Sequence, residues 1–119
     1  QNHLIGCVTM QKHHLFRAIG NVVQNAIEYT PKGGTVTIEG SMLEDGWQII
    51  VHDEGPGFSK AAILHATERL WRGDSARAST GHNGLGLWFA SQVIKNHNGQ
   101  ILLSNSANGG VVVMNFKQN

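Results

Sequence analysis

The spacing of apolar residues along the chain predicts two long amphipathic helices. Apolar side chains recur every three or four residues from Gln11 to Thr30 and again from Gly84 to about Asn98, so each segment would bury one face. The run 31–34 (Pro-Lys-Gly-Gly) would end the first helix. Gly20 lies in the middle of that helix, where glycine costs about 1 kcal/mol relative to alanine, so a close contact is expected there.

Short apolar or alternating runs predict the strands of a sheet. They occur at residues 4–10, 35–39, 47–53, 101–105 and 111–116, with turns at 43–46 and 108–110. A short helix is predicted over residues 59–65, capped by Ser59. The pattern as a whole predicts an α/β fold, a two-layer sandwich with a mixed sheet of about five strands and helices on one face.

Composition narrows the class of protein. The 119 residues fit one domain, which we expect to span 1–119, and the start without Met in mid-pattern suggests a fragment of a longer protein. A net charge of +1 gives no basic surface for nucleic acid and no basic amphipathic face for a membrane. No apolar run has the length of a membrane span. Cys7 is the only cysteine and is interpreted as a buried free thiol.

The stretch Asp53-Glu54-Gly55-Pro56-Gly57-Phe58, which follows a predicted strand, is the first candidate for chemistry. An acid at the end of a strand can be a fixed acceptor at a pocket floor. Glycines next to it let the backbone approach a flat ligand, because a Cβ would be in the way. An ordinary turn is the alternative interpretation of the same residues.

Two further patterns carry candidate ligand groups. Asn21 and Asn25 lie four residues apart on the first predicted helix, where asparagine is a poor interior residue, so their amides are either aimed at a ligand or form a polar helix edge. The pattern Gly81-x-x-Gly84-x-Gly86 precedes the last predicted helix, where backbone N–H groups can bind phosphate. It is not a P-loop, because no Lys-Ser/Thr follows, and its spacing is the reverse of a Rossmann fingerprint.

In this order the motifs resemble the ATP-binding catalytic domain (HATPase, GHKL-type) of sensor histidine kinases in two-component systems. Residues 21–31, 53–58, 70–74 and 84–87 are similar to the family's N, G1, F and G2 boxes, and Gly109-Gly110 is similar to its final glycine motif. The resemblance covers about residues 11–117. It implies a Bergerat-type ATP-binding fold.

The resemblance also implies a role for individual residues. Asp53 would accept the adenine amino group, Tyr29 would pack on the adenine ring, and Gly55 and Gly57 would complete the nucleotide pocket. The groups implied for the metal and phosphates are Asn25 as the Mg²⁺ ligand, Asn21 beside it as a catalytic residue, the backbone of Gly84, Leu85 and Gly86, and the cations Arg72 and Arg77.

The function implied is binding of Mg²⁺-ATP and donation of the γ-phosphoryl group to a histidine on a separate dimerisation domain of the same kinase, with a response regulator downstream. The isolated domain is expected to be a monomer without autophosphorylation. It would lie in the cytoplasm, with the parent protein anchored in the cell membrane. No nucleic acid partner and no direct membrane contact are expected.

Some residues depart from the family's pattern and leave alternatives open. Glu28 stands where the family often has Lys or Arg, Thr67 and Leu70 replace aromatic residues of the F box, and His82 replaces a common glycine. These departures favour a degenerate nucleotide-binding or docking module as the alternative. A serine kinase that acts as an anti-sigma factor shares the fold. A gyrase-like ATPase is disfavoured, because Asn21 cannot act as the base that activates water.

Overall fold

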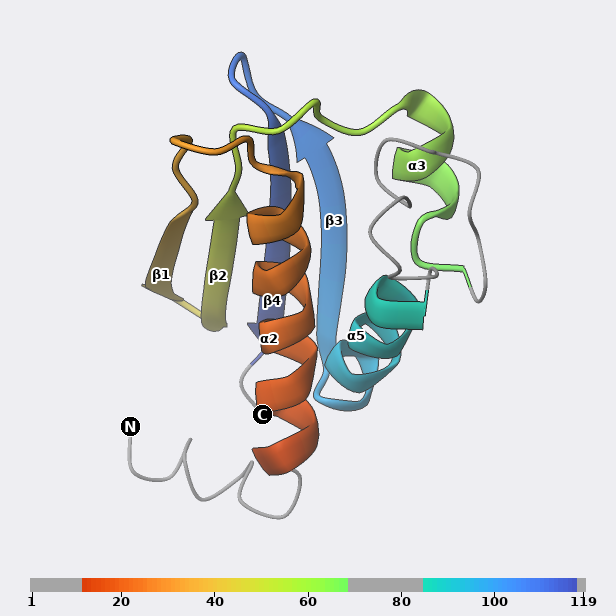
Figure 1. Cartoon of the computed structure of the whole chain (residues 1–119). Coiled ribbons are helices and arrows are strands. Elements are labelled where there is room, and N and C mark those ends of the chain that lie inside the picture. Colours follow the sequence, from red (N-terminus) through yellow and green to blue (C-terminus); the bar gives the residue numbers. More distant parts are fainter. Residues whose placement is uncertain (1–11, 69–84, 118–119) are drawn as a thin grey trace.

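The computed structural model describes residues 12–68 and 85–117 (Figure 1). The elements are, in chain order, α2 (Lys12–Tyr29), β1 (Thr37–Leu43), β2 (Gly46–His52), α3 (Lys60–His65), α5 (Leu85–Asn96), β3 (Gly99–Asn105) and β4 (Gly110–Lys117). The two long helices agree with the apolar periodicity of the sequence. The predicted strand at residues 4–10, with Cys7, lies outside the described residues.

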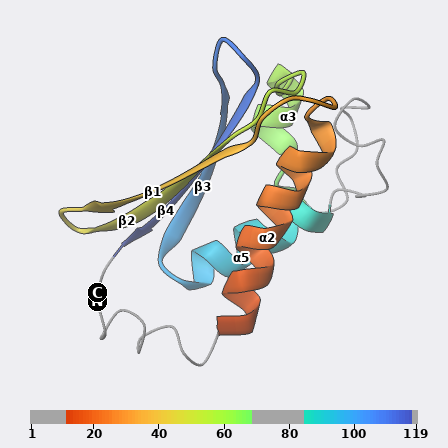
Figure 2. The same ribbon diagram turned by 60° about the vertical axis from the view of Figure 1, so that its left-hand side comes forward.

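The described strands form one sheet in the order β1-β2-β4-β3, and every neighbouring pair is antiparallel. Helices α2 and α5 cover one face of it, which confirms the two-layer sandwich (Figure 2). In the described part of the chain the sheet therefore has four antiparallel strands, where a mixed sheet of about five was expected. Short connections account for two of the three antiparallel pairs: residues 44–45 join β1 to β2 and residues 106–109 join β3 to β4, and such hairpins are antiparallel.

The core lies between the helices and the sheet. Strand alternation turns Val51 of β2 and Val112, Met114 and Phe116 of β4 toward α2 and α5. Trp47 stacks on Phe116 with ring centroids 4.1 Å apart, which closes the core at the end of the sheet away from the β2–α3 connection. The helices contribute small and branched side chains to the same core, namely Leu15, Ala18, Val22, Ala26, Ala90, Val93 and Ile94.

Two boundaries differ from the sequence prediction. Strand β1 was expected over residues 35–39, but it runs from Thr37 to Leu43 and pairs with β2 as far as Leu43 opposite Gly46. All seven of its residues are exposed, so it lacks the alternating pattern that marks a half-buried strand. The close contact expected at Gly20 is also not found, since a Cβ there would meet no atom of residues 12–68 and 85–117 within 4 Å.

The signals at helix ends are confirmed. The Ser59 hydroxyl accepts a hydrogen bond from the N–H of Ala62 at 3.0 Å, as an N-cap does. Asn98, with φ of 61°, adopts the left-handed conformation that ends α5 before β3 begins. Within residues 12–68 and 85–117 no helix combines the length and apolarity needed to cross a membrane.

Candidate functional site

The acidic glycine turn follows β2, and its first residue is fixed. Asp53 is 3% exposed. Its Oδ1 accepts hydrogen bonds from the N–H of Gly55 at 2.9 Å and from the N–H of Gly110 at 3.1 Å. The backbone N–H of Asp53 donates to the carbonyl of Gly110 at 2.9 Å. The carboxylate is therefore held at the point where the β2–β4 ladder ends, as expected for a fixed acceptor.

Glycines around Asp53 make room for backbone. A Cβ on Gly55 would lie 2.5 Å from the carbonyl oxygen of Tyr29, and a Cβ on Gly109 would meet the carbonyl oxygen of Asp53. A Cβ on Gly110 would lie 3.0 Å from Asp53 Oδ2. From the sequence, a functional role for Gly109-Gly110 was indicated only by their similarity to the final glycine motif of the kinase family. The structure gives the physical reason for two glycines here, because the backbone of Gly109 and Gly110 packs directly against Asp53.

Helix α2 reaches the turn at its C-terminal end, where the Tyr29 carbonyl contacts Gly55. Asn21, Asn25 and Tyr29 are spaced by four residues, so they follow one side of the helix at intervals of about 6 Å. Tyr29 is 7% exposed and Asn25 is 8% exposed, while Asn21 is half-buried. The structure thus brings Tyr29 next to the acidic turn, with Asn25 one helical turn and Asn21 two turns away.

Glu28, the main departure in α2, has a neighbour on its own helix. Gln24 Nε2 donates to Glu28 Oε2 at 3.1 Å. The carboxylate is half-buried and directed toward the preceding helical turn. This bond orients one carboxylate oxygen of Glu28 along its own helix.

The predicted phosphate side of the site is described only in part. Leu85 and Gly86 form the first turn of α5, while Arg72, Arg77 and Gly84 lie outside the described residues. Helices α2 and α5 pack against each other, so the start of α5 belongs to the same layer as the asparagines of α2 (Figure 2). The phosphate contacts of these five residues stay predictions.

Sequence reasoning missed two contacts that hold the turn. Glu54 Oε1 accepts a hydrogen bond from the N–H of Thr35 at 3.0 Å, which ties the turn to the α2–β1 connection. The side-chain amide of Asn105, at the end of β3, binds the backbone of Phe58. Both pairs join residues far apart in the sequence, so no local pattern indicates them.

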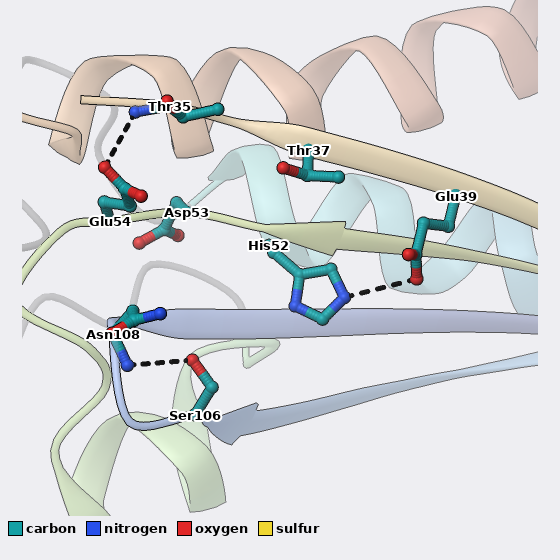
Figure 3. A pocket seen from close by; sticks show the side chains of 8 residues that line it. All are labelled: Thr35, Thr37, Glu39, His52, Asp53, Glu54, Ser106 and Asn108. Atoms are coloured by element: carbon teal, nitrogen blue, oxygen red, sulfur yellow. Dashed lines mark hydrogen bonds and ion pairs between the residues drawn. The ribbon is translucent and has the colours of Figure 1, made fainter. Parts of the chain in front are cut away.

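A pocket of about 280 Å³ lies beside Asp53 on the sheet face opposite the helices (Figure 3). His52 and Glu39 point into it, and His52 Nε2 lies 3.4 Å from Glu39 Oε1. Of the predicted site residues that the structure describes, this pocket includes Asp53 and none of Asn21, Asn25 and Tyr29, so it lies beside the predicted nucleotide site. Its lining residues are Thr35, Thr37, Glu39, His52, Asp53, Glu54, Ser106 and Asn108.

The donor set on α2 fits a magnesium ion that is shared with phosphate groups. Among residues 12–68 and 85–117, no group of three or more His, Cys, Asp or Glu side chains could hold a metal by itself. Mg²⁺ usually takes one or two protein oxygens and fills its other positions with water and phosphate oxygens. The single buried amide of Asn25 is compatible with that arrangement.

Comparison with protein-family sequence models gives the class of protein. Residues 10–118 match the sequence model of the histidine kinase-, DNA gyrase B- and HSP90-like ATPases, so the chain belongs to this family of ATP-binding domains. This confirms the family inferred from the four motifs.

The similar proteins are sensor kinases. SpaK of Bacillus subtilis, a sensor histidine kinase, is 40% identical over 99 residues, which cover 83% of this chain and 22% of SpaK. The kinase/phosphatase MprB of Mycobacterium ulcerans is 38% identical over 97 residues, covering 81% of this chain and 19% of MprB. The chain therefore spans about a fifth of the length of these two relatives.

Solved structures agree with the fold. The mycobacterial sensor histidine kinase MprB superimposes with a TM-score of 0.77 at 27% identity, over 88% of this chain and 70% of that one. Full-length ShkA in complex with AMPPNP has a TM-score of 0.70 at 22% identity, over 89% of this chain and 22% of that one, and shows the likeness of fold alone. The two-layer arrangement is thus shared with the sensor histidine kinase MprB.

Proposed function

We propose that this chain is the catalytic domain of a sensor histidine kinase, which binds Mg²⁺-ATP and donates the γ-phosphoryl group to a histidine on a separate dimerisation domain. One observation carries the proposal: the buried carboxylate of Asp53, held by the N–H groups of Gly55 and Gly110 beside the end of α2. A buried acceptor held in a fixed orientation supports the role of adenine acceptor that we propose for Asp53 in this family of ATP-binding domains.

Asp53 would select adenine by hydrogen bonding. A carboxylate has only acceptors, so it accepts the exocyclic amino group of adenine and repels the carbonyl that guanine has at the same position. Two backbone N–H groups already fix Oδ1, so the acceptor is oriented before a ligand arrives. Gly55 and Gly57 let the turn pack closely on Tyr29 and Asn105. We expect the backbone of these two glycines to border the adenine ring, with Tyr29 packed against it.

The metal and phosphate roles rest on α2 and the start of α5. Asn25 would ligate Mg²⁺ through its amide oxygen, with Asn21 one turn away near the metal and phosphates. Bound Mg²⁺ supplies neutralisation of phosphate charge. The backbone N–H groups of Gly84, Leu85 and Gly86 would bind phosphate at the helix start, where the helix dipole favours anions. Arg72 and Arg77 would add positive charge.

The catalytic work of such a site is positioning and charge stabilisation, with little covalent chemistry of its own. The accepting histidine would belong to the dimerisation domain of the same kinase, and a response regulator would receive the phosphoryl group afterwards. We expect residues 1–119 to form one domain, monomeric when isolated, on the cytoplasmic side of a membrane-anchored parent. The length of the relatives supports a longer parent.

The alternative is a module that binds nucleotide or docks to a partner without kinase activity. The half-buried carboxylate of Glu28, one residue before Tyr29 on α2, is the observation that favours it. Phosphotransfer to a dimerisation domain supplied in trans separates the two functions. Labelled phosphate on that domain supports the kinase, and ATP binding without transfer supports the alternative.

The experiment that tests the proposal is calorimetric titration of ADP and of a non-hydrolysable ATP analogue, with and without Mg²⁺, into wild type and Asp53→Asn. Asparagine keeps the shape but replaces an acceptor with a donor, so we expect adenine affinity to fall about 10- to 100-fold, as for loss of a charge-assisted hydrogen bond. Asp45→Asn, in the exposed β1–β2 turn, is the matched control and should bind like wild type. Wild type that binds no nucleotide at millimolar concentration would contradict the proposal.

A further inference from the structure

Asn105, the last residue of β3, holds the end of the acidic turn with its side chain. Its Oδ1 accepts a hydrogen bond from the N–H of Phe58 at 2.7 Å, and its Nδ2 donates to the carbonyl of Phe58 at 2.9 Å. The amide therefore binds both backbone groups of one residue, as a neighbouring strand would. Figure 1 shows the segment between β2 and α3 passing the end of β3, where this contact is made.

The backbone before Phe58 is shaped to receive this amide. Gly57 has φ of +80°, which L side chains rarely adopt. A Cβ on Gly57 would also lie 3.0 Å from Asn105 Oδ1. A glycine is thus required here for its dihedral angle and for the approach of the amide. Asn105 itself is exposed as a residue, so its contribution lies in these two hydrogen bonds more than in core packing.

Phe58 links this contact to the acid at the other end of the turn. Its side chain is 5% exposed, and its Cε2 atom lies 3.0 Å from the position that a Cβ on Gly110 would take. Gly110 is the residue whose N–H binds Asp53. The turn is consequently fixed at its first residue by Gly110 and at its last by Asn105, with Gly55 and Gly57 held between them.

We infer that Asn105 is a positioning residue of the nucleotide site, an inference that rests on the function proposed above. Asn105 binds the backbone of Phe58 and acts on the ligand only through the turn. It sets the path of Gly55-Pro56-Gly57 and so keeps the N–H of Gly55 on the Asp53 carboxylate. A turn released at Phe58 would let Gly55 move, and the adenine acceptor would lose one of the two hydrogen bonds that orient it.

The test compares Asn105→Ala and Asn105→Asp with the control Ser104→Ala. Ser104 is the exposed neighbour of Asn105 on β3, so its replacement leaves the two hydrogen bonds between Asn105 and Phe58 intact. Alanine removes both hydrogen bonds, whereas aspartate keeps an acceptor for the N–H of Phe58 and loses the donor. Two quantities are measured for each variant: the dissociation constant of ADP by calorimetry, and the hydrogen-exchange rates of the Gly55 and Val51 amides by NMR.

For Asn105→Ala we expect about tenfold weaker ADP binding, the factor that one hydrogen bond of typical strength represents. Exchange of the Gly55 amide should become about tenfold faster while Val51, a buried residue of the inner strand β2, keeps its rate. Asn105→Asp should lie between alanine and wild type, and Ser104→Ala should match wild type. The selective change at Gly55 is the readout that a purely structural role would not give.

Three outcomes would overturn the inference. ADP affinity of Asn105→Ala within twofold of wild type means that Asn105 does not position the site. Equal acceleration of exchange at Gly55 and Val51 means that Asn105 only stabilises the whole fold. A wild-type protein that binds no ADP instead overturns the proposed function, and this result is distinguished from the other two because it appears before any variant is compared.

Discussion

Strand β2 is flanked on each side by two acidic residues followed by a glycine, and these two triplets have different surroundings. Glu44-Asp45-Gly46 leads into the strand, and Asp53-Glu54-Gly55 follows it. Glu44 and Asp45 are exposed, and within residues 12–68 and 85–117 neither side chain makes a hydrogen bond or ion pair. Asp53 is 3% exposed, and Glu54 binds the backbone of Thr35.

The difference lies in the distance along the chain to the residues that hold each acid. The first triplet is positioned by the adjacent strand alone, since Leu43 pairs with Gly46 in a hairpin. The second is held by Gly110, 57 residues later, and by Thr35, 19 residues earlier. Similar residues thus form an exposed turn at one end and a fixed acceptor at the other. Tertiary partners, more than residue type, decide which acids are held in place.

The largest expected effect on stability comes from adding one methyl group at Gly109, whose backbone packs against Asp53. In Gly109→Ala the Cβ would meet the carbonyl oxygen of Asp53, so strand β4 and the turn must move apart. We expect a loss of about 3 kcal/mol in the free energy of unfolding, the upper part of the range for overpacking. Urea denaturation followed by circular dichroism measures it.

The control is Gly40→Ala in β1, where the Cβ would have only the Gln48 carbonyl oxygen, at 3.9 Å. It should change stability by no more than about 0.5 kcal/mol. Equal losses of unfolding free energy for the two variants would contradict the view that the backbone at Gly109 is more tightly packed than that at Gly40.

A smaller effect is expected from the acids themselves. Glu54→Ala removes the acceptor of the Thr35 N–H and should cost about 1 kcal/mol, since this hydrogen bond is exposed to solvent. Glu44→Ala, at the other end of β2, should stay within about 0.5 kcal/mol of wild type. Thermal unfolding of the two variants at matched pH and salt compares them, and a greater loss for Glu44→Ala would refute the asymmetry between the triplets.

The smallest effect has the opposite sign and concerns a glycine that no neighbour requires. Gly20 is exposed in the interior of α2, and a Cβ there would contact nothing within 4 Å. Gly20→Ala should therefore stabilise the protein by about 0.5–1 kcal/mol, because alanine is the better helix former. A rise in the melting temperature without a change in ADP affinity is the expected result. Destabilisation would contradict the view that Gly20 has no packing role.

Much of the fold could be predicted because it depends on local periodicity. The apolar spacing in α2 and α5 and the cap at Ser59 are sequence signals that act over one or two helical turns. The extent of β1 could not be predicted in this way. Its seven residues are exposed on both sides of the strand, and only pairing with β2 shows where it ends.

The candidate site likewise has a part that the sequence predicts and a part that it does not. Asp53, Gly55 and Gly57 stand close together in the sequence and could be recognised as a unit. The contact between Asn105 and Phe58 spans 47 residues and joins an unremarkable strand end to a backbone amide, so no spacing rule indicates it. The resemblance to a kinase family supplied roles for known motifs but gave no reason to examine a residue outside them.

The pairing of Asp53 with Gly110 has a consequence for the order in which the protein matures. Strand β4 is the last of the described elements to leave the ribosome, and Gly110 is its first residue. Until β4 inserts between β2 and β3, the carboxylate lacks one of its two backbone donors and the core lacks Met114 and Phe116. A nascent chain interrupted before β4 would therefore lack both the completed sheet and the second hydrogen bond to the Asp53 carboxylate, so the acceptor that we propose for adenine would be fixed only after the last described strand has paired.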